Sequence, residues 1–270
     1  MPSPALAGLV GALFLGVLQG LTEFLPVSSS GHLVLFQQFL EIGDDHVLFD
    51  LVLHLGTLLP VLWFYRADIG RLLLDPFTGD GPLASRHGVR TWALLVTASL
   101  PTAAIGLVFE DTFEALFSRP AALTVTFAVT GALLFLSGRL ERESKQALSF
   151  PIAFVLGIAQ GLAITPGISR SGSTIATGLL LGLEREEAAR FSFLMSVPAI
   201  LGATLLRLGD AAEATLHPPQ LLVGFLASMV TGYLALVLLV KLVRTGMFPH
   251  FAWYCWFAAI VAGALTLFHG

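Results

Sequence analysis

The sequence has few charged residues and almost no cysteine. Charged side chains make up 12% of its 270 residues, whereas an average soluble protein has about a quarter. The one cysteine, Cys255, excludes an internal disulfide framework and a metal site of several thiolates. The net charge of −4 provides no basic surface, so we expect no nucleic-acid partner. The N-terminal segment has no basic residues, so we expect no cleaved signal peptide.

Apolar residues, in contrast, are abundant. They account for 56% of the chain and occur in long runs that are interrupted by glycine and proline. Such runs are typical of helices in lipid. The composition therefore predicts an all-α integral membrane protein in which residues 1–270 form a single membrane domain, with membrane lipid as a partner.

Two short polar stretches, residues 19–32 and 165–174, interrupt the apolar runs and resemble each other. Without gaps and at an offset of 141 residues, the segments around them share these pairs: Leu15/Leu156, Gly16/Gly157, Gln19/Gln160, Gly20/Gly161, Leu21/Leu162, Ser28/Ser169, Ser30/Ser171 and Gly31/Gly172. Self-similarity of this kind indicates a duplicated unit. We predict a first repeat at residues 1–146 and a second at residues 147–270, each with one half of a site.

Each polar stretch lies between two apolar segments, and the second segment is too short to cross a bilayer. Residues 5–21 would rise about 25 Å as a helix, but residues 33–40 only about 12 Å, against a hydrocarbon core of about 30 Å. The arrangement recurs at residues 150–164 and 174–183. We predict two re-entrant helical hairpins whose irregular turns lie at depth, surrounded by protein or by a wet cavity.

Three transmembrane helices are predicted after each hairpin. Basic residues, which favour the cytoplasmic side, gather in the predicted loops 66–90, 139–146 and 184–190, whereas Arg119 alone lies on the other side. The second hairpin then enters from the cytoplasm and the first from outside, so the fold class is an inverted-topology repeat. The six transmembrane helices are predicted at residues 47–65, 91–109, 121–138, 191–206, 220–240 and 251–268.

Three ionisable residues, Glu23, His32 and Arg170, fall at the predicted depth of the hairpin tips. Each costs about 2.5–3.5 kcal/mol on insertion scales, so they should face one another or water. If the tips meet, Arg170 and the N-termini of both return helices converge and form a receptor for phosphate. The tips would also bring together the hydroxyl and backbone groups of Ser28, Ser29, Ser30, Gly31, Ser169, Ser171, Gly172, Ser173 and Thr174.

Phosphate binding alone does not require Glu23 and His32. Glu23 lies one helical turn after Gln19, so the two could hold a divalent cation, or Glu23 could be a general base. His32 could protonate a leaving oxygen or activate an attacking serine. An acid and a base beside an anion site favour phosphoryl hydrolysis.

Both motifs resemble those of the bacterial undecaprenyl-diphosphatase (bacitracin-resistance) family. The likeness rests on Gln-x-x-x-Glu before Pro-Val-Ser-Ser-x-Gly-His, and on Pro-Gly-x-Ser-Arg-Ser-x-x-Thr in the second repeat, and it covers nearly the whole chain. The resemblance implies hydrolysis of undecaprenyl diphosphate to the monophosphate, the carrier lipid of peptidoglycan synthesis. It also implies a location in the bacterial cytoplasmic (inner) membrane, with the site open to the outer face.

The resemblance further implies roles for individual residues. Many members have Glu at the position of Gln19, which weakens the case for two carboxylates on a Mg²⁺ or Ca²⁺ ion. Two mechanisms stay open: a phosphoserine intermediate and the attack of a water activated by Glu23. The oligomeric state, for which a homodimer is one possibility, also stays open. By position, the acidic motif falls on Gln19 and Glu23, the essential histidine on His32, the candidate nucleophile on Ser29, and the phosphate-binding arginine on Arg170, with Ser169 and Thr174.

Other interpretations of these residues also stay open. Serines 28–30 could merely satisfy carbonyls freed by the bend, and Glu23 could be a structural partner of Arg170. Broken helices are also typical of a secondary transporter or flippase for an anionic lipid. Asp50 and His54 are expected to pair internally rather than to bind metal. Interface anchors are expected at Lys241, Arg244, Trp253, Tyr254 and Trp256.

Overall fold

The computed structural model describes residues 4–39, 46–74, 84–117, 119–141, 146–207, 209 and 218–269. These residues are almost entirely helical, and an isolated bridge between Gln146 and Leu183 is the one β-type contact among them. The all-α prediction is therefore confirmed for this part of the chain. The first half contains α1 (Pro4–Phe24), α2 (Ser29–Phe39), α3 (His46–Phe64), α4 (Arg66–Leu74), α5 (Ala84–Val108), α6 (Glu110–Phe117) and α7 (Pro120–Arg139). The second half contains α8 (Phe150–Leu162), α9 (Arg170–Leu180), α10 (Arg185–Leu206), α12 (Pro218–Arg244), the 3₁₀-helix η1 (Phe248–His250) and α13 (Phe251–His269).

Several helices are long and apolar enough to cross a membrane. Within the described ranges these are α5, α7, α10, α12 and α13. The consecutive helices α3 and α4 pass the same test as a pair but are bent by 78° where they join, which gives up to six spans. Each predicted transmembrane helix overlaps one of these elements, so the chain is a multi-pass membrane protein. The shorter apolar helices α1 and α8 are the first arms of the two predicted hairpins.

Some predicted boundaries are wrong. The predicted loop 66–90 contains α4 and the first turns of α5, and the predicted loop 184–190 is mostly the start of α10. Charges indicated loops there, but Glu186 and Glu187 favour a helix because they lie at the positive end of the α10 dipole. The return helices α2 and α9 also begin earlier than predicted, at Ser29 and Arg170. The polar tip residues therefore lie in first helical turns, where backbone N–H groups lack intrahelical partners.

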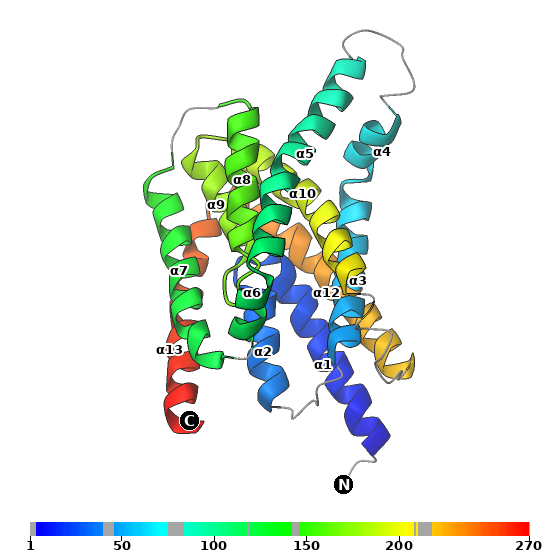
Figure 1. Cartoon of the computed structure of the whole chain (residues 1–270), viewed down its shortest axis with the longest axis vertical. Helices are drawn as coiled ribbons and strands as arrows, with labels where there is room; N and C mark the ends of the chain where they lie inside the picture. Colours follow the sequence, from blue (N-terminus) through cyan, green and yellow to red (C-terminus); the bar gives the residue numbers. More distant parts are fainter. Residues whose placement is uncertain are drawn as a thin grey trace.

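The two hairpins enter from opposite ends of the molecule. Figure 1 shows α1 and α2 in the lower half and α8 and α9 in the upper half, with the breaks between their arms near the middle. Pro26 lies in the first break and Pro166 in the second, and proline cannot continue a helical hydrogen-bond ladder. Gly167 adopts a φ of +87°, a left-handed conformation that favours glycine.

Glycines allow each hairpin to pack closely on one long helix. α1 packs along α12, and α8 packs along α5. A Cβ atom added to any of four glycines would meet the partner helix at these positions: Gly16 at Gly224 and Ala227, Gly20 at Thr231, Gly157 at Ala98 and Pro101, and Gly161 at Ile105. Small residues permit such close approach between helices in membranes. The contacted residues on the two partner helices are also related by one offset: each contacted residue of α12 lies 126 positions after its counterpart in α5.

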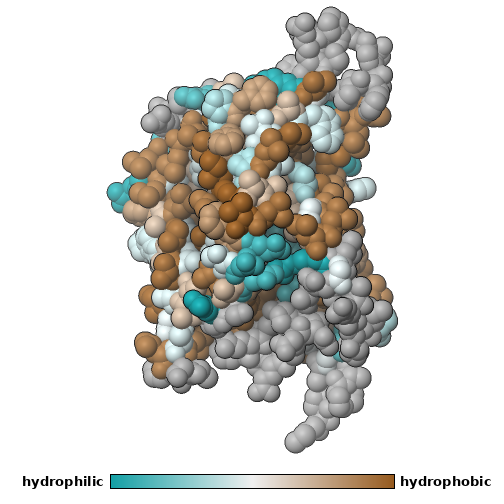
Figure 2. Space-filling view, viewed as in Figure 1, coloured by the Kyte–Doolittle hydropathy of each residue, from teal (hydrophilic) through white to brown (hydrophobic). Residues whose placement is uncertain are grey.

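The surface is mainly apolar, as lipid contact requires. Figure 2 shows hydrophobic residues over most of one face, with hydrophilic residues mainly at its upper edge and in one lower patch. Large apolar side chains such as Val108, Phe257 and Ile260 are more than half exposed. Exposing so much apolar surface to water is unfavourable, whereas contact with lipid acyl chains is not.

Ion pairs join the two halves of the chain around α10. The Arg185 guanidinium donates to both oxygens of Glu141 at 2.8 Å. Arg190 donates to an oxygen of Asp68 at 2.8 Å. These partly exposed contacts connect the start of α10 to α4 and to the segment just after α7.

Candidate active site

The tips of the two hairpins touch each other. The hydroxyl of Ser171, in the second tip, donates to the carbonyl oxygen of Leu25, in the first tip, at 3.4 Å. A Cβ atom on Gly31 would lie 2.8 Å from the Cα atom of Gly167, so the missing side chain lets the two backbones meet. The expected convergence of the polar stretches is present in this structure.

The Glu23 carboxylate, 7% exposed, lies at the centre of the joined tips. Its Oε1 atom accepts a hydrogen bond from Nη2 of Arg170 at 2.5 Å, which is an ion pair between the two repeats. Its Oε2 atom accepts from the Ser29 hydroxyl at 2.6 Å and from the Gln19 amide at 3.0 Å. The carboxylate therefore binds the candidate nucleophile and the candidate phosphate ligand together.

The two tips use the same capping geometry. The Ser28 hydroxyl accepts from the backbone N–H of Gly31 at 3.3 Å, and the Ser169 hydroxyl accepts from that of Gly172 at 3.0 Å. Each capping serine also lies 3.3 Å, between hydroxyl oxygens, from the serine two residues later: these pairs are Ser28/Ser30 and Ser169/Ser171. Serine caps of this kind fix where a helix begins. The equivalent caps aim both helix N-termini at the site.

The backbone of the first tip is strained at Ser28. Its φ of +67° makes it the one non-glycine residue with positive φ among those the structure describes. Left-handed conformations cost of order 1–3 kcal/mol for residues other than glycine and tend to occur at functional sites. Ser28 directly precedes Ser29, whose hydroxyl donates to Glu23.

Two buried donors at the joined tips have no hydrogen-bond partner in the described structure. They are Nη1 of Arg170 and the hydroxyl of Ser173, which is 4% exposed. Unsatisfied buried polar groups cost about 1–3 kcal/mol each. Because α9 begins at Arg170, its positive end adds to the field of the guanidinium. The second tip is therefore prepared to accept an anion.

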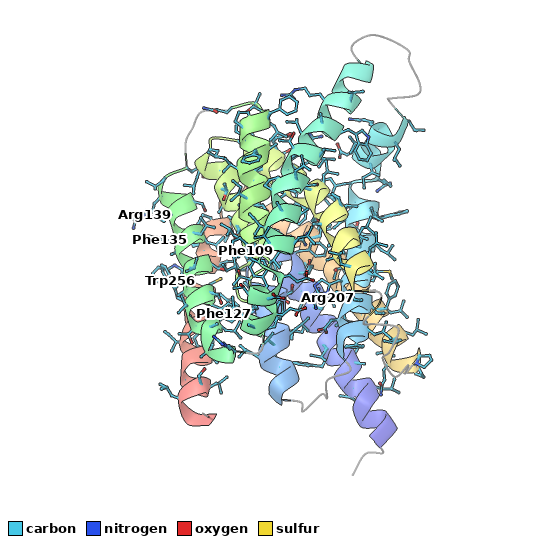
Figure 3. All side chains as sticks on the ribbon, in the orientation of Figure 1. Phe109, Phe127, Phe135, Arg139, Arg207 and Trp256 are labelled. Carbon is cyan, nitrogen blue, oxygen red and sulfur yellow. The ribbon has the colours of Figure 1, made fainter. Side chains whose placement is uncertain are left out.

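His32 lies near these groups but does not bind Ser29. Its Nδ1 atom is 2.8 Å from the Ser28 carbonyl oxygen, and its Nε2 atom is 2.7 Å from the hydroxyl oxygen of Tyr254. Phe127, which Figure 3 labels, packs edge-on against the ring at a centroid distance of 5.3 Å. In this structure the Ser29 proton is therefore directed to Glu23 and not to His32.

The Thr174 hydroxyl also forms its hydrogen bonds with groups other than Glu23 and Ser29. Its hydroxyl donates to the carbonyl oxygen of Arg170 at 2.8 Å and lies 2.5 Å from the Ser192 hydroxyl. These contacts connect the first turn of α9 to α10. Thr174 thus holds the second tip in place, while Arg170 and Ser173 keep donors available.

Gln19 and Glu23 fit the donor chemistry of a divalent cation. The Oε1 atom of Gln19 is a fully buried acceptor without a hydrogen-bond partner, one helical turn from the Glu23 carboxylate. Mg²⁺ commonly takes one or two protein oxygens and completes its shell with water and phosphate. The described residues contain no group of three His, Cys, Asp or Glu side chains placed to hold a metal by themselves.

The sequence did not identify three contacts of the joined tips. The Nε2 atom of His54 lies 3.7 Å from Oε2 of Glu23, and its Nδ1 atom lies 2.7 Å from the Asp50 backbone oxygen, whereas the predicted internal pair of the Asp50 and His54 side chains stays a prediction. Tyr254, which was expected to be an interface anchor, also contacts His32. The Thr130 hydroxyl accepts from the N–H of Ser169 at 3.2 Å. A polar residue at an apolar position was the only signal available for Thr130.

Comparison with known proteins gives a consistent result along the chain. Residues 12–261 match the family described as bacitracin resistance protein BacA. A protein named undecaprenyl-diphosphatase from Carboxydothermus hydrogenoformans is 43% identical over 256 residues, which cover 92% of this chain and 94% of that protein. Proteins of the same name from Halothermothrix orenii and Methanobrevibacter smithii are 41% and 39% identical, over 92% and 96% of this chain and 95% and 98% of theirs. The similarity includes both hairpins.

Proposed function

This chain belongs to the bacitracin resistance protein BacA family, and from that premise we propose that it hydrolyses undecaprenyl diphosphate to undecaprenyl phosphate and inorganic phosphate. The observation that carries this proposal is the Glu23 carboxylate, which accepts from the Ser29 hydroxyl and pairs with Arg170. The product is the carrier lipid of peptidoglycan synthesis, and its supply accounts for bacitracin resistance.

The second tip binds the diphosphate. Arg170 turns its guanidinium toward the phosphate oxygens. Its Nη1 atom has no hydrogen-bond partner and is available to the phosphate, whereas the phosphate competes with the Glu23 carboxylate for Nη2. The Ser173 hydroxyl and the N-terminal N–H groups of α9 and α2 supply further donors. These groups also stabilise the negative charge that develops during transfer.

The first tip performs the transfer. The Ser29 oxygen attacks the terminal phosphorus, its proton passes to Glu23 over the 2.6 Å hydrogen bond, and the phosphoanhydride bond breaks. Undecaprenyl phosphate leaves, and the phosphoryl group stays on Ser29. Glu23 returns the proton to the leaving undecaprenyl phosphate. As a carboxylate again, it accepts a proton from the water that attacks the phosphoserine, and it passes this proton to the Ser29 oxygen as the bond from that oxygen to phosphorus breaks and inorganic phosphate leaves.

Gln19 and Glu23 would hold a divalent cation. Bound there, a cation such as Mg²⁺ would neutralise charge on the phosphate oxygens. Gln19 contributes independently, because its amide hydrogen bond to Glu23 fixes the carboxylate that receives the serine proton.

In the membrane, the chain forms six spans and two re-entrant hairpins as an inverted repeat of residues 1–146 and 147–270. The glycine contacts support this proposal, because one offset relates both hairpins and another relates both partner helices. The basic residues Arg66, Arg71 and Arg90 then lie at the cytoplasmic end. The site opens to the outer side of the cytoplasmic membrane, where the lipid substrate enters laterally.

Phosphate release from undecaprenyl diphosphate by the purified protein tests this function. We expect release by the wild type and at least about a hundredfold lower kcat/KM for Glu23→Ala and Arg170→Ala. A matched control is available in the exposed ion pair of Glu114 and Arg207, whose atoms lie 3.7 Å apart. The variants Glu114→Ala and Arg207→Ala should keep wild-type turnover. Full activity in both site variants would reject the assigned roles.

The alternative function is an anion transporter or flippase, because broken helices are also typical of transporters. A carrier has no evident use for a carboxylate that accepts a serine proton beside the anion site. Lipid flipping by reconstituted protein, without any release of phosphate, would favour that alternative over hydrolysis.

A further inference from the structure

The hydrogen bonds of His32 determine which of its nitrogens carries the proton. A backbone carbonyl oxygen only accepts, so Nδ1, at 2.8 Å from the Ser28 oxygen, must be the protonated nitrogen. In a neutral ring Nε2 then has a lone pair and accepts from the hydroxyl of Tyr254 at 2.7 Å. The two rings also stack, with centroids 5.7 Å apart and planes within 15°. The contact is thus directional as well as close.

α13 contacts the first tip at two consecutive residues. Besides the contact of Tyr254 with His32, the Cys255 sulfur lies 3.4 Å from the carbonyl oxygen of Pro26. Pro26 and His32 flank Ser28, whose left-handed backbone needs support from its surroundings. The last helix of the second half therefore braces both ends of the strained turn in the first half.

We propose that Tyr254 is a positioning residue for the attack by Ser29. Its hydroxyl donates to Nε2 of His32 and keeps the histidine proton on Nδ1, where it holds the Ser28 carbonyl. The peptide between Ser28 and Ser29 is thereby fixed, and the Ser29 hydroxyl stays directed at Glu23. The role of Ser29 as nucleophile rests on the proposed function, but the contact of Tyr254 with His32 does not.

Nitrogen NMR tests the contact directly. The probe is the full-length protein in detergent, labelled with ¹⁵N in its histidine rings, with the His32 signals identified by their loss in His32→Asn. In the wild type we expect a neutral ring with a protonated Nδ1 atom and an Nε2 atom that accepts a hydrogen bond. In Tyr254→Phe, which keeps the ring, the Nε2 signal should move downfield because a lone pair without a donor is deshielded.

Kinetics test the positioning role, with Tyr233→Phe as the matched control. This substitution on α12 also removes one tyrosine hydroxyl, and Tyr233 is 39% exposed against 43% for Tyr254. We expect Tyr254→Phe to lower kcat roughly tenfold with KM changed less than about twofold, the loss of about one hydrogen bond in the transition state. The control should keep wild-type values, and both variants should unfold thermally like the wild type.

Two results would overturn the inference. One is a set of His32 nitrogen signals that is identical in the wild type and in Tyr254→Phe, whatever happens to turnover. The other is a loss of kcat no larger than that of Tyr233→Phe. If the wild type itself releases no phosphate, the proposed function fails, while the nitrogen spectra still decide the contact.

Discussion

At the residue scale, the proposed chemistry depends on the Ser29 hydroxyl and the Glu23 carboxylate. A hydroxyl is a weak nucleophile until a base takes its proton, and in the proposed mechanism Glu23 is that base, over a hydrogen bond of 2.6 Å. We therefore predict a phosphoserine at Ser29 when excess enzyme is mixed with undecaprenyl diphosphate and quenched with acid within one turnover. Mass spectrometry of the peptide should detect it, and Ser29→Ala should lack it. Normal turnover by Ser29→Ala would instead favour a water activated by Glu23.

Gln19 leads to a second prediction at the residue scale. Its buried, unpaired oxygen beside Glu23 fits a cation that also binds phosphate. We expect excess chelator to reduce phosphate release by at least about tenfold and added Mg²⁺ or Ca²⁺ to restore it. Gln19→Glu, which adds a second carboxylate, should need a lower cation concentration for half-maximal activity. Unchanged turnover in excess chelator would remove the cation from the site.

The sequence was informative about single residues where each carried its own signal. Ionisable residues at depth, next to serine and glycine, were enough to predict that Glu23 and Arg170 lie together, whereas the family resemblance selected Ser29 among the serines. It was not informative about His54, Thr130 and Tyr254, because their contacts depend on which faces α3, α7 and α13 turn toward the tips. That choice is made by tertiary packing and leaves no local pattern.

At the element scale, the hairpins depend on glycine contacts with α12 and α5. A Cβ atom at Gly16 would lie 2.8 Å from that of Ala227, whereas one at Gly11, also on α1, would meet nothing within 4 Å. We predict that Gly16→Ala lowers stability by about 1–3 kcal/mol through overpacking. Gly11→Ala should leave it unchanged or slightly higher. Thermal unfolding in detergent measures both, and equal midpoints would contradict the close packing.

The breaks in the helices were predictable because their causes are local. Pro26 and Pro166 cannot continue a helix, and the serines that follow cap the next one. The start of α10 was missed because its charges were taken to mark a loop, although acidic residues in a first turn favour a helix. Charge counts did not separate a loop from a helix that carries charged residues in its first turns.

At the scale of the whole molecule, the proposed inverted repeat places the two ends in Figure 1 in opposite compartments. Replacing Cys255 by Ala removes the single cysteine, so new cysteines report position without background. We predict that a membrane-impermeant maleimide, added to intact cells, labels Glu114→Cys but labels Arg71→Cys only after lysis. Both positions are exposed in this structure. Labelling of Arg71→Cys in intact cells would contradict the orientation.

The proposed repeat also accounts for two similar motifs at one site. At the offset of 141 residues, Glu23, Ser29 and His32 correspond to Ile164, Arg170 and Ser173. In the proposed mechanism the first copy provides the base and the nucleophile, and the second provides the anion ligands. The sequence predicted that the two tips meet, and the structure shows their contact between Glu23 and Arg170, whereas the division of roles stays a prediction.

A double-mutant cycle between the tips tests that division most directly. The measured quantity is kcat/KM for undecaprenyl diphosphate in the wild type, Ser29→Ala, Arg170→Ala and the double variant. If both tips act on one phosphoryl group, the double variant should be about as slow as the slower single variant, because residues that act as a unit lose their effect together. Losses that multiply across the two substitutions, or a double variant with wild-type activity, would show that the two hairpins do not form one catalytic site.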